Sequence, residues 1–448
     1  MAIIGVVTDD FTGTASAGML MAKRQVETGL FFDEKQMQEF HDVDQLEAIY
    51  VSTSSRNAAP ELAYDLVYQA ARTLRTMGVR YYSKKIDTTL RGGIGYEVDA
   101  LLDFLGEDTM AVMVTAMPQS RRVCVGGYSV IDGVLLTETS IAQDVKRPVK
   151  ECYIPDLMRS QTRRQVGWIS IRDVKKGTEH LKQTFTDLRA QGVQVVVVDA
   201  ITMEHVQEIA KACVELQWNI LPVDPGPFTV QMAACRGIAR EERQPEENAP
   251  EAQCGRTALF IAGSANPSTG IQIQRLMEDD PRNHQVSVNP ISLINGGPER
   301  SREVERVFDQ VAALMEQPER PRAIVVETAF HGSLVNLDEE DRAHEYEKGG
   351  SSAMINEGLA QITEMVLNQY GKERISGLML TGGDTMECVA RKIGVTCIKA
   401  LDNIVAQVDV GRILGRYEGM PVVVKGGFCG YDEIGIDIVK RLAKECMK

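Results

Sequence analysis

The feature that most constrains this chain is a recurring order of three segments. A short apolar run, often β-branched, is followed by a polar or glycine-rich turn and then by an amphipathic stretch. Several runs are almost unbroken, as in VQVVVVDA at 193–200 and MPVVVKG at 420–426. Strands covered by helices on both faces have this composition. Strands that alternate with helical segments are typical of parallel sheets, so the pattern predicts an α/β fold with mostly parallel sheets.

The pattern repeats through the whole chain. Strands are expected at residues 3–8, 48–52, 81–85, 110–115, 193–199, 220–223, 258–262, 323–327, 377–381 and 422–425. Helices are expected at residues 14–24, 60–77, 95–105, 178–191, 203–217, 300–317, 350–370 and 433–444. Most of these helices come after one of the strands, as the α/β interpretation requires.

A charged segment divides the chain in two. Residues 240–256, REERQPEENAPEAQCGR, hold two prolines and almost no apolar side chains, so they cannot pack as an element. A length of 448 residues agrees with two or three domains. We predict an N-terminal domain at 1–243, a linker at 244–255 and a C-terminal domain at 256–448. The cleft between such domains is the expected active site.

Composition excludes several classes of protein. The chain has 63 acidic and 49 basic residues, a formal net charge of −14, and no long basic run, which argues against nucleic-acid binding. No apolar run is long enough to cross a membrane, and two aspartates within the first ten residues argue against a secretory leader. Nine cysteines without a C-x-x-C pair fit a reducing compartment. We expect a cytoplasmic protein without a nucleic-acid or membrane partner.

Two adjacent carboxylates follow the first expected strand. Asp9 and Asp10 lie in TDDFTG, residues 8–13, ahead of a helix. Ligands of open α/β sheets bind at the carboxyl ends of strands. The pair could hold Mg²⁺, accept a proton or hydrogen-bond hydroxyls. Alternatively, one of the two caps the following helix, and position alone leaves both interpretations open.

A second polar cluster occupies KKIDTTLRGGIGYE, residues 84–97. Its glycines let the backbone approach a ligand, Arg91 can bind a carboxylate through two nitrogens, and Asp87 can accept from hydroxyls. Arg56 follows another strand end and could belong to the same anion pocket. The alternative is a solvated charged turn with a solvated loop arginine.

Three glycine-rich turns follow expected strands in the C-terminal half. They are AGSANPST at 262–269, LTGGDT at 380–385 and VVKGGFCG at 423–430. Main-chain N–H groups at helix N-termini bind phosphates. One such turn would usually be only a tight turn, but three in one domain favour a nucleotide site. The P-loop motif is absent from the sequence.

At these positions the sequence resembles the four-carbon acid sugar kinase family, formerly a domain of unknown function. TDDFTG is similar to its opening D-D-F-T-G, and KKIDTTLRGGIGYEVDAL to its K-x-D-S-T-L-R-G-N segment. TAMPQSRRVCVGGYSVIDGVLLTET, residues 115–139, resembles its P-A-x-P-x-x-G-R block with the stretch that follows. GSANPST, TGGDT and VKGGFCG resemble its G-S, G-G-[DE]-T and K-S-G-x-F-G elements. Six motifs in family order, over nearly the whole chain, make the resemblance specific.

The resemblance implies an ATP-dependent kinase, a phosphotransferase with an alcohol group as acceptor. Its substrate would be the terminal hydroxyl of a four-carbon sugar acid such as threonate, erythronate or an oxo-tetronate, with ATP and Mg²⁺ as cofactors. The N-terminal domain would bind the acid and the C-terminal domain ATP. The acid site would contain Asp9 and Asp10 as catalytic residues, with Arg56, Lys85, Asp87 and Arg91 as binding residues. The nucleotide site would contain Ser264, Gly382, Gly383, Asp384, Thr385 and Gly427.

The sequence departs from the family pattern at a few positions. Thr14, Ala15 and Ser16 replace the small residue and the acid that often follow D-D-F-T-G, Arg121 replaces a glycine, and Gly426 replaces a serine. The phosphate-facing glycines are kept, so these changes mainly concern which sugar acid the protein accepts as its substrate. No residue is assigned as a metal ligand, and a homodimer is one possible assembly.

Two other functions stay open. A nicotinamide-dependent sugar-acid dehydrogenase would use a similar fold, but the third glycine of a dinucleotide-binding loop is missing. A non-catalytic organic-acid-binding protein would leave the three C-terminal turns without a role.

Overall fold

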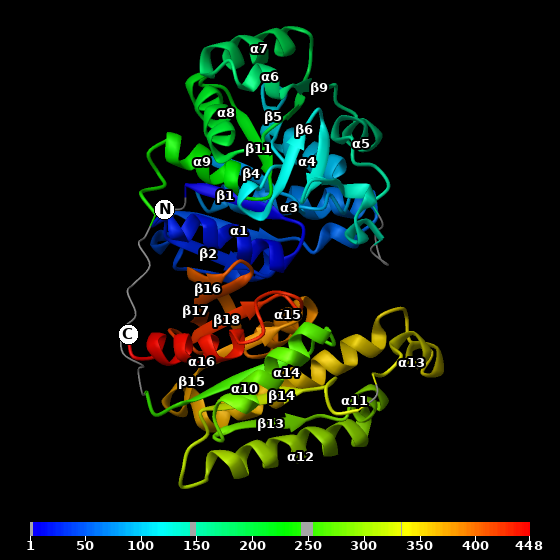
Figure 1. Ribbon diagram of the computed structural model, residues 1–448, viewed down its shortest axis with the longest axis vertical. Helices are drawn as coiled ribbons and strands as arrows, with labels where there is room; N and C mark the ends of the chain where they lie inside the picture. Colours follow the sequence, from blue (N-terminus) through cyan, green and yellow to red (C-terminus); the bar gives the residue numbers. More distant parts are fainter. Residues whose placement is uncertain (1–2, 144–148, 243–253, 333) are drawn as a thin grey trace. The chain divides into compact units, whose positions relative to one another are not determined.

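The computed structural model describes residues 3–143, 149–242, 254–332 and 334–448. The chain forms two compact units, Met1–Arg243 and Gln244–Lys448 (Figure 1). Most of the linker predicted at 244–255 lies outside the described residues. The α/β class with mostly parallel sheets is confirmed in both units.

The strands of the first unit are short. They are β1 (Ile4–Thr8), β2 (Thr28–Phe31), β3 (Ala48–Ser52), β4 (Tyr81–Lys85), β5 (Met110–Met113), β6 (Arg122–Val125), β7 (Tyr128–Ile131), β8 (Val134–Leu135), β9 (Val166–Ile169), β10 (Val195–Val198) and β11 (Ile220–Asp224). The helices are α1 (Phe11–Lys23), α2 (Glu34–Glu39), α3 (Pro60–Thr76), α4 (Ile94–Leu105), α5 (Ile154–Gln161), α6 (Ile171–Val174), α7 (Thr178–Ala190), α8 (Met203–Glu215) and α9 (Pro227–Cys235).

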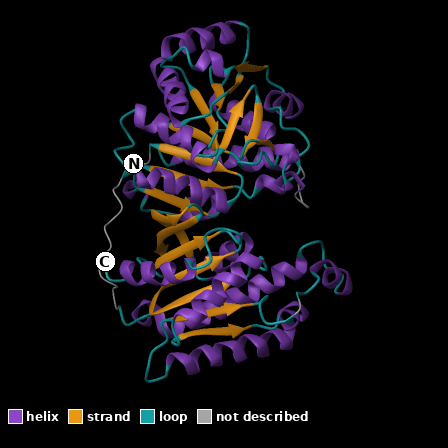
Figure 2. Ribbon diagram, in the orientation of Figure 1, coloured by secondary structure: helices purple, strands orange, loops and turns teal. Residues whose placement is uncertain are grey.

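The main sheet of this unit is parallel, in the order β2-β3-β1-β4-β11-β5-β10-β9. Helices α1 and α6–α9 pack as one layer and α2–α5 as another, with the strands between them (Figure 2). The chain reaches β3 on one side of β1 and β4 on the other, which makes the end of β1 a topological switch point. Thr8 is in register with Ser52 and Lys85, so three strands end at one level.

A small antiparallel sheet, β6-β7-β8, accompanies the main sheet. Asp199, at the end of β10, holds it in place. Its buried carboxylate accepts hydrogen bonds from the main-chain N–H groups of Gly126 and Gly127 at 2.7 and 2.9 Å. The indole N–H of Trp168 donates to the same carboxylate at 3.0 Å.

The described strands of the second unit belong to one sheet. Its strands are β12 (Thr257–Ala262), β13 (Asn283–Ser287), β14 (Ala323–Glu327), β15 (Ile375–Thr381), β16 (Val395–Val405), β17 (Val408–Gly415) and β18 (Pro421–Lys425). Its helices are α10 (Pro267–Asp279), α11 (Pro290–Asn295), α12 (Gly297–Met315), α13 (Leu337–Ala343), α14 (Gly350–Arg374), α15 (Gly383–Lys392) and α16 (Ile434–Glu445).

The strand order in this unit is β13-β14-β12-β15-β18-β17-β16, parallel up to β18 and antiparallel through β17 and β16. Helices α10 and α16 pack together, and α11–α15 form the other layer around α14 (Figure 2). Ala262 pairs with Thr381, and Thr381 pairs with Lys425. The ends of β12, β15 and β18 therefore lie side by side, and the three glycine-rich turns leave the sheet at one edge.

Candidate functional site

The charged side chains predicted at the carboxyl ends of strands in the first unit lie together. The guanidinium of Arg56, which follows β3, bridges both aspartates that follow β1. Its Nε is 2.7 Å from Oδ2 of Asp9, and its Nη1 is 2.7 Å from Oδ2 of Asp10. Nζ of Lys85, at the end of β4, lies 3.7 Å from Oδ1 of Asp9 and 3.8 Å from Oδ1 of Asp10. Residues from three neighbouring strands thus form one cluster at the switch point.

Asp9 and Arg56 stabilise each other's charged forms. Burial of Asp9 would raise its pKa, but Arg56 and Lys85 outweigh burial and hold the pKa well below its usual range. Burial would lower the pKa of Arg56, and the neighbouring aspartates instead raise it. Asp9 therefore stays ionised at neutral pH. Its Oδ1 is buried and accepts no hydrogen bond from the described residues, and Nζ of Lys85 lies 3.7 Å from it.

Asp10 has a structural task as well. It is the N-cap of α1, and its Oδ1 accepts a hydrogen bond at 2.9 Å from the main-chain N–H of Gly13. The capping alternative is correct for Asp10, while its second oxygen still contacts Arg56. Gly13 also makes room for Lys85, because a Cβ at position 13 would lie 1.9 Å from Nζ.

Asp87 and Arg91 form the outer part of the cluster. Nε and Nη2 of Arg91 lie 2.6 and 3.3 Å from the two carboxylate oxygens of Asp87. Thr89 donates to the same carboxylate at 2.5 Å. Burial would raise the pKa of Asp87, but Arg56 and Arg91 lower it. Arg91 is 27% exposed at its side chain against 15% for Arg56, so it is the more accessible guanidinium.

A buried ion pair that the sequence did not single out supports this cluster. Nζ of Lys84 lies 2.9 Å from Oε2 of Glu97, and both side chains are almost fully buried. The hydroxyl of Ser55 donates to Oε1 of the same glutamate at 2.5 Å. This network ties β4, α4 and the loop that carries Arg56. Both charges lie at the ends of the motif at 84–97, but no local pattern in the sequence indicates that they pair.

The three turns of the second unit contact one another. A Cβ at Gly427 would lie 2.4 Å from Oγ of Ser264, and one at Gly263 would lie 2.1 Å from Oγ1 of Thr385. Gly382 has a φ of 102°, a conformation that disfavours other residues. Thr385 is buried and donates to Oδ1 of Asn356 in α14 at 2.7 Å. The predicted residues at these turns therefore form one surface of closely spaced main chain.

Lys425 fixes the shape of the third turn. Its buried ammonium donates to the carbonyl oxygens of Gly426, Gly427 and Cys429 at 2.9, 3.3 and 3.2 Å. Burial lowers its pKa to about 8, so the amine is still protonated near neutral pH. In this structure Lys425 organises main chain that was expected to meet phosphate.

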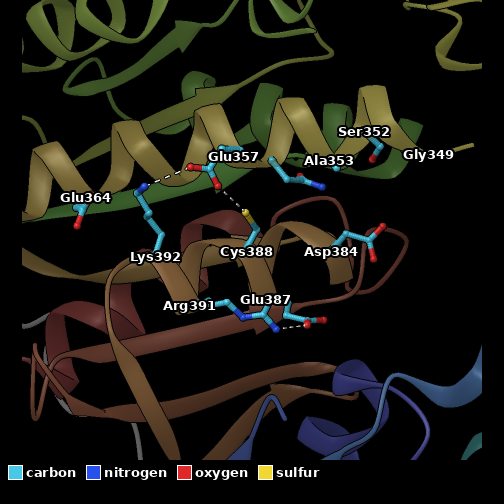
Figure 3. Close-up of a pocket in the computed structure, with 11 residues that line it drawn as sticks. Gly349, Ser352, Ala353, Glu357, Glu364, Asp384, Glu387, Cys388, Arg391 and Lys392 are labelled. Carbon is cyan, nitrogen blue, oxygen red and sulfur yellow. Dashed lines mark hydrogen bonds and ion pairs between the residues drawn. The ribbon is translucent and has the colours of Figure 1, made fainter. Parts of the chain in front are cut away.

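Asp384, in the second of these turns, lines a pocket between α14 and α15 (Figure 3). The pocket has a volume of about 660 Å³. Glu357 of α14 points between Lys392 and Cys388 of α15, at 3.2 Å from Nζ of the lysine. About half of the surface that lines the pocket is polar. The pocket lies wholly within the second unit and opens beside the predicted nucleotide residues.

Of two departures from the family pattern, one is strained and the other has a steric explanation. Arg121 adopts a left-handed conformation, with φ 52° and ψ 32°, at the position where the family has glycine. A Cβ at Gly426 would lie 2.8 Å from Sγ of Cys429, so the sulfur occupies space that a serine at position 426 would need. The third departure is internal to α1, where the buried hydroxyl of Thr14 donates to the carbonyl of Asp10 at 2.8 Å.

No group of three or more histidine, cysteine, aspartate or glutamate side chains suited to a metal ion occurs among the described residues. Mg²⁺ in phosphoryl-transfer sites is commonly held by one or two carboxylates together with substrate phosphates. The exposed Asp384, at the N-terminus of α15, fits that role. Within the same described part of the chain, no helix has the length and apolar character needed to cross a membrane.

Two domain families match the chain, and together they define a class of two-domain proteins with a sugar-binding and a nucleotide-binding domain. Residues 4–232 match a sugar-binding N-terminal domain family, and residues 259–434 match a nucleotide-binding C-terminal domain family. A D-erythronate kinase of Heliobacterium modesticaldum is 30% identical over 443 residues, covering 99% of this chain and 97% of that protein. The chain belongs to the four-carbon acid sugar kinase family, as the resemblance implied.

Further relatives have different names within that family. A D-threonate kinase of Salmonella typhimurium is 27% identical, with 95% of each chain covered. A 3-oxo-tetronate kinase of Haemophilus influenzae is 26% identical, covering 88% of this chain and 89% of the relative. Among solved structures, a Salmonella typhimurium protein matches with a TM-score of 0.78 at 19% identity, over 98% of this chain and 99% of the other. At that identity the last likeness shows the fold alone.

Proposed function

We propose that this protein is an ATP-dependent kinase that phosphorylates the terminal hydroxyl of a four-carbon sugar acid. The observation that carries the proposal is the cluster of Asp9, Arg56, Lys85, Asp87 and Arg91 at the switch point of the sugar-binding unit. A tetronate has one carboxylate and several hydroxyls, so its site needs cations beside hydroxyl acceptors. The similarity to D-erythronate, D-threonate and 3-oxo-tetronate kinases supports this substrate class.

We assign different tasks to the two arginines. Arg56 is held by both aspartates and is mostly buried, so it positions them. Arg91 has the more exposed side chain of the two, so we assign it to the ligand carboxylate. Asp9 is ionised and has a buried oxygen ready to accept a hydrogen bond, so it orients or deprotonates the attacking hydroxyl. Asp10 shares that task and caps α1.

The nucleotide is assigned to the second unit. Main-chain amides of the turns at Ser264, Gly382, Gly383 and Gly427 would bind phosphates, and Asp384 would help to hold Mg²⁺. Mg²⁺ neutralises charge on the transferring phosphoryl group. Positioning and charge stabilisation supply most of the catalysis in such reactions. Transfer requires that the two sites meet during turnover, and the interdomain active-site cleft remains a prediction.

The test is a coupled assay of ADP formation with the full chain, ATP and Mg²⁺. The panel contains D-erythronate, D- and L-threonate, 3-oxo-tetronates and acids of five and six carbons. We expect ADP release only with four-carbon acids and a phosphorylated acid by mass spectrometry. Binding of the acids without ADP release would favour the binding-protein alternative. Acid-dependent reduction of a nicotinamide nucleotide would favour the dehydrogenase.

A further inference from the structure

Three segments that carry residues of the proposed acid site meet one buried hydrogen-bond network. The segments are the end of β1, the loop at 53–56 after β3 and the end of β4. At the centre of the network is Glu97, in the first turn of α4, whose side chain is almost fully buried. Its two carboxylate oxygens contact different segments, so one residue of α4 joins parts of the site that come from three strands.

One oxygen of Glu97 holds the loop that carries Arg56. Oε1 accepts a hydrogen bond at 2.5 Å from the hydroxyl of Ser55, a fully buried residue. Oγ1 of Thr53 lies 2.7 Å from Oγ of Ser55 and 2.8 Å from the carbonyl oxygen of Thr8. The network therefore extends from α4 across the loop to the last residue of β1, which directly precedes the two aspartates.

The other oxygen of Glu97 holds the end of β4. Oε2 lies 2.9 Å from Nζ of Lys84, and the same ammonium donates to the carbonyl oxygen of Lys85 at 2.8 Å. Nζ of Lys85 in turn lies 3.7 and 3.8 Å from carboxylate oxygens of Asp9 and Asp10. The buried ammonium thus fixes the main chain of the residue whose side chain enters the acid site.

The backbone before Arg56 needs such an anchor. Ser54 adopts a left-handed conformation, with φ 50° and ψ 28°, which residues other than glycine disfavour. The main-chain N–H of Arg56 donates to the carbonyl oxygen of Asp9 at 3.3 Å, which is long for a hydrogen bond of this kind. The hydrogen bond from Ser55 to Glu97 has a charged acceptor and is therefore the stronger constraint on this turn.

We propose that Glu97 is a positioning residue of the acid site, which acts through Ser55 on Arg56 and through Lys84 on Lys85. It holds the two cations at the spacing at which they meet the aspartates. The inference rests on the proposed function, because it concerns the affinity of the same site for a sugar acid. A network with a merely structural role would change the stability of the protein and leave the affinity of the folded molecules for the acid unchanged.

The first variant is Ser55→Ala, which removes the hydroxyl and leaves the pair of Lys84 and Glu97. We expect kcat/KM for the best four-carbon acid to fall about tenfold or more, the effect of losing a hydrogen bond to a charged group. The KM for ATP should not change, because the nucleotide is assigned to the other unit. Ser83→Ala is the matched control and should keep the wild-type kcat/KM. Ser83 is also buried, and its hydroxyl lies 2.5 Å from Oγ1 of Thr229, outside the network.

The double variant Lys84→Met/Glu97→Leu separates positioning from stability. It removes both buried charges together, so its free energy of unfolding should return close to that of the wild type. Its kcat/KM for the acid should still be at least as low as that of Ser55→Ala, because neither the loop nor the end of β4 is held. Wild-type kcat/KM in either variant, or an equal loss in Ser83→Ala, would overturn the proposal. If the double variant does not fold, Ser55→Ala and its control decide.

Calorimetry of acid binding without nucleotide distinguishes a failure of this proposal from a failure of the proposed function. Binding of a four-carbon acid to the wild type with no ADP release would refute the kinase. A weaker affinity for the acid in Ser55→Ala would in that case still support the positioning role. ADP release by the wild type, together with a wild-type Kd and kcat/KM for the acid in Ser55→Ala, would overturn the positioning role alone. No binding of any acid to the wild type would overturn both.

Discussion

Nε of Arg56 lies 2.7 Å from Oδ2 of Asp9, and this ion pair joins the ends of two neighbouring parallel strands, β1 and β3. The two residues are 47 positions apart in the chain. The pair fixes a charged aspartate in a buried place, where it would otherwise be protonated or excluded. The proposed chemistry depends on that arrangement.

Asp9→Asn keeps the shape of the side chain and removes its charge. If Asp9 orients or deprotonates the hydroxyl, turnover with the best four-carbon acid should fall by about 10²- to 10³-fold, or roughly 3–4 kcal/mol. ATP affinity, measured by calorimetry, should not change, because the nucleotide is assigned to the other unit. Asp10→Asn keeps a side chain that caps a helix well. Any fall in turnover in this variant therefore reports the lost charge and not a folding defect. Wild-type turnover in both variants would refute the assignment.

The Arg56–Asp9 pair should make stability depend on pH. The folded-state pKa of Asp9 is below the unfolded value near 4. The pair therefore contributes stability above that pH and loses it as the pH falls. In Arg56→Ala the pKa of Asp9 should rise, because the aspartate stays buried without this partner. The difference in free energy of unfolding between the variant and the wild type should therefore be largest at pH 7 and smallest near pH 3. Urea unfolding across this range measures the difference.

Arg159→Ala is the control for this experiment. Arg159 pairs with Asp156 at 2.6 Å on the surface, where both side chains are about half exposed. Exposed pairs contribute little, so this variant should follow the wild-type pH profile. A constant difference between Arg56→Ala and the wild type over the whole range would contradict the linkage.

Glu97→Ala should strongly destabilise the first unit. It leaves the buried ammonium of Lys84 without its carboxylate, and breaking a buried ion pair costs about 3–5 kcal/mol. Urea unfolding followed by circular dichroism measures the loss. The double variant Lys84→Met/Glu97→Leu should recover much of it, because no isolated charge remains. Asp156→Ala, in the exposed pair, should cost less than about 1 kcal/mol.

Gly427→Ala should impair the nucleotide site. The added Cβ would lie 2.4 Å from Oγ of Ser264, so that hydroxyl must leave its place between the two turns. Overpacking of this kind costs about 1–3 kcal/mol. Expressed as lost nucleotide affinity, this cost raises the KM for ATP roughly five- to 150-fold and changes the KM for the acid little. Gly332→Ala is the control, since a Cβ added there would have no atom of the described residues within 4 Å. A similar KM for ATP in both variants would contradict the assignment.

Arg121→Gly should stabilise the protein. Glycine removes the strain of the left-handed backbone, which raises the free energy of unfolding by about 1–2 kcal/mol. The greater freedom of glycine in the unfolded chain lowers it by about 0.5–1 kcal/mol. The net gain in the free energy of unfolding should be at most about 1.5 kcal/mol in urea unfolding. The ion pair with Asp132 is exposed and adds little. Arg122→Gly, one residue on and inside β6, should destabilise instead.

The predicted parallel strands are present with nearly the predicted bounds, because strands buried on both faces need continuous apolar runs. The antiparallel pair β16 and β17 was not predicted. Many of the side chains in β16 are half exposed, so polar residues interrupt its apolar pattern.

The predicted site residues of each unit lie together, and their roles remain predictions. The sequence placed Asp9, Arg56 and Lys85 at strand ends. It could not indicate that Arg56 bridges both aspartates or that Glu97 pairs with Lys84.

The sequence by itself determined the α/β class, the positions of the turns and the residue types that those turns carry. These properties follow from local hydrophobic pattern and backbone preference. The strand order, and with it the partner of each charge, was decided only by the tertiary structure. Parallel strands that adjoin in space can be far apart in sequence, so the free energy of their side-chain pairs depends on contacts that no local pattern records.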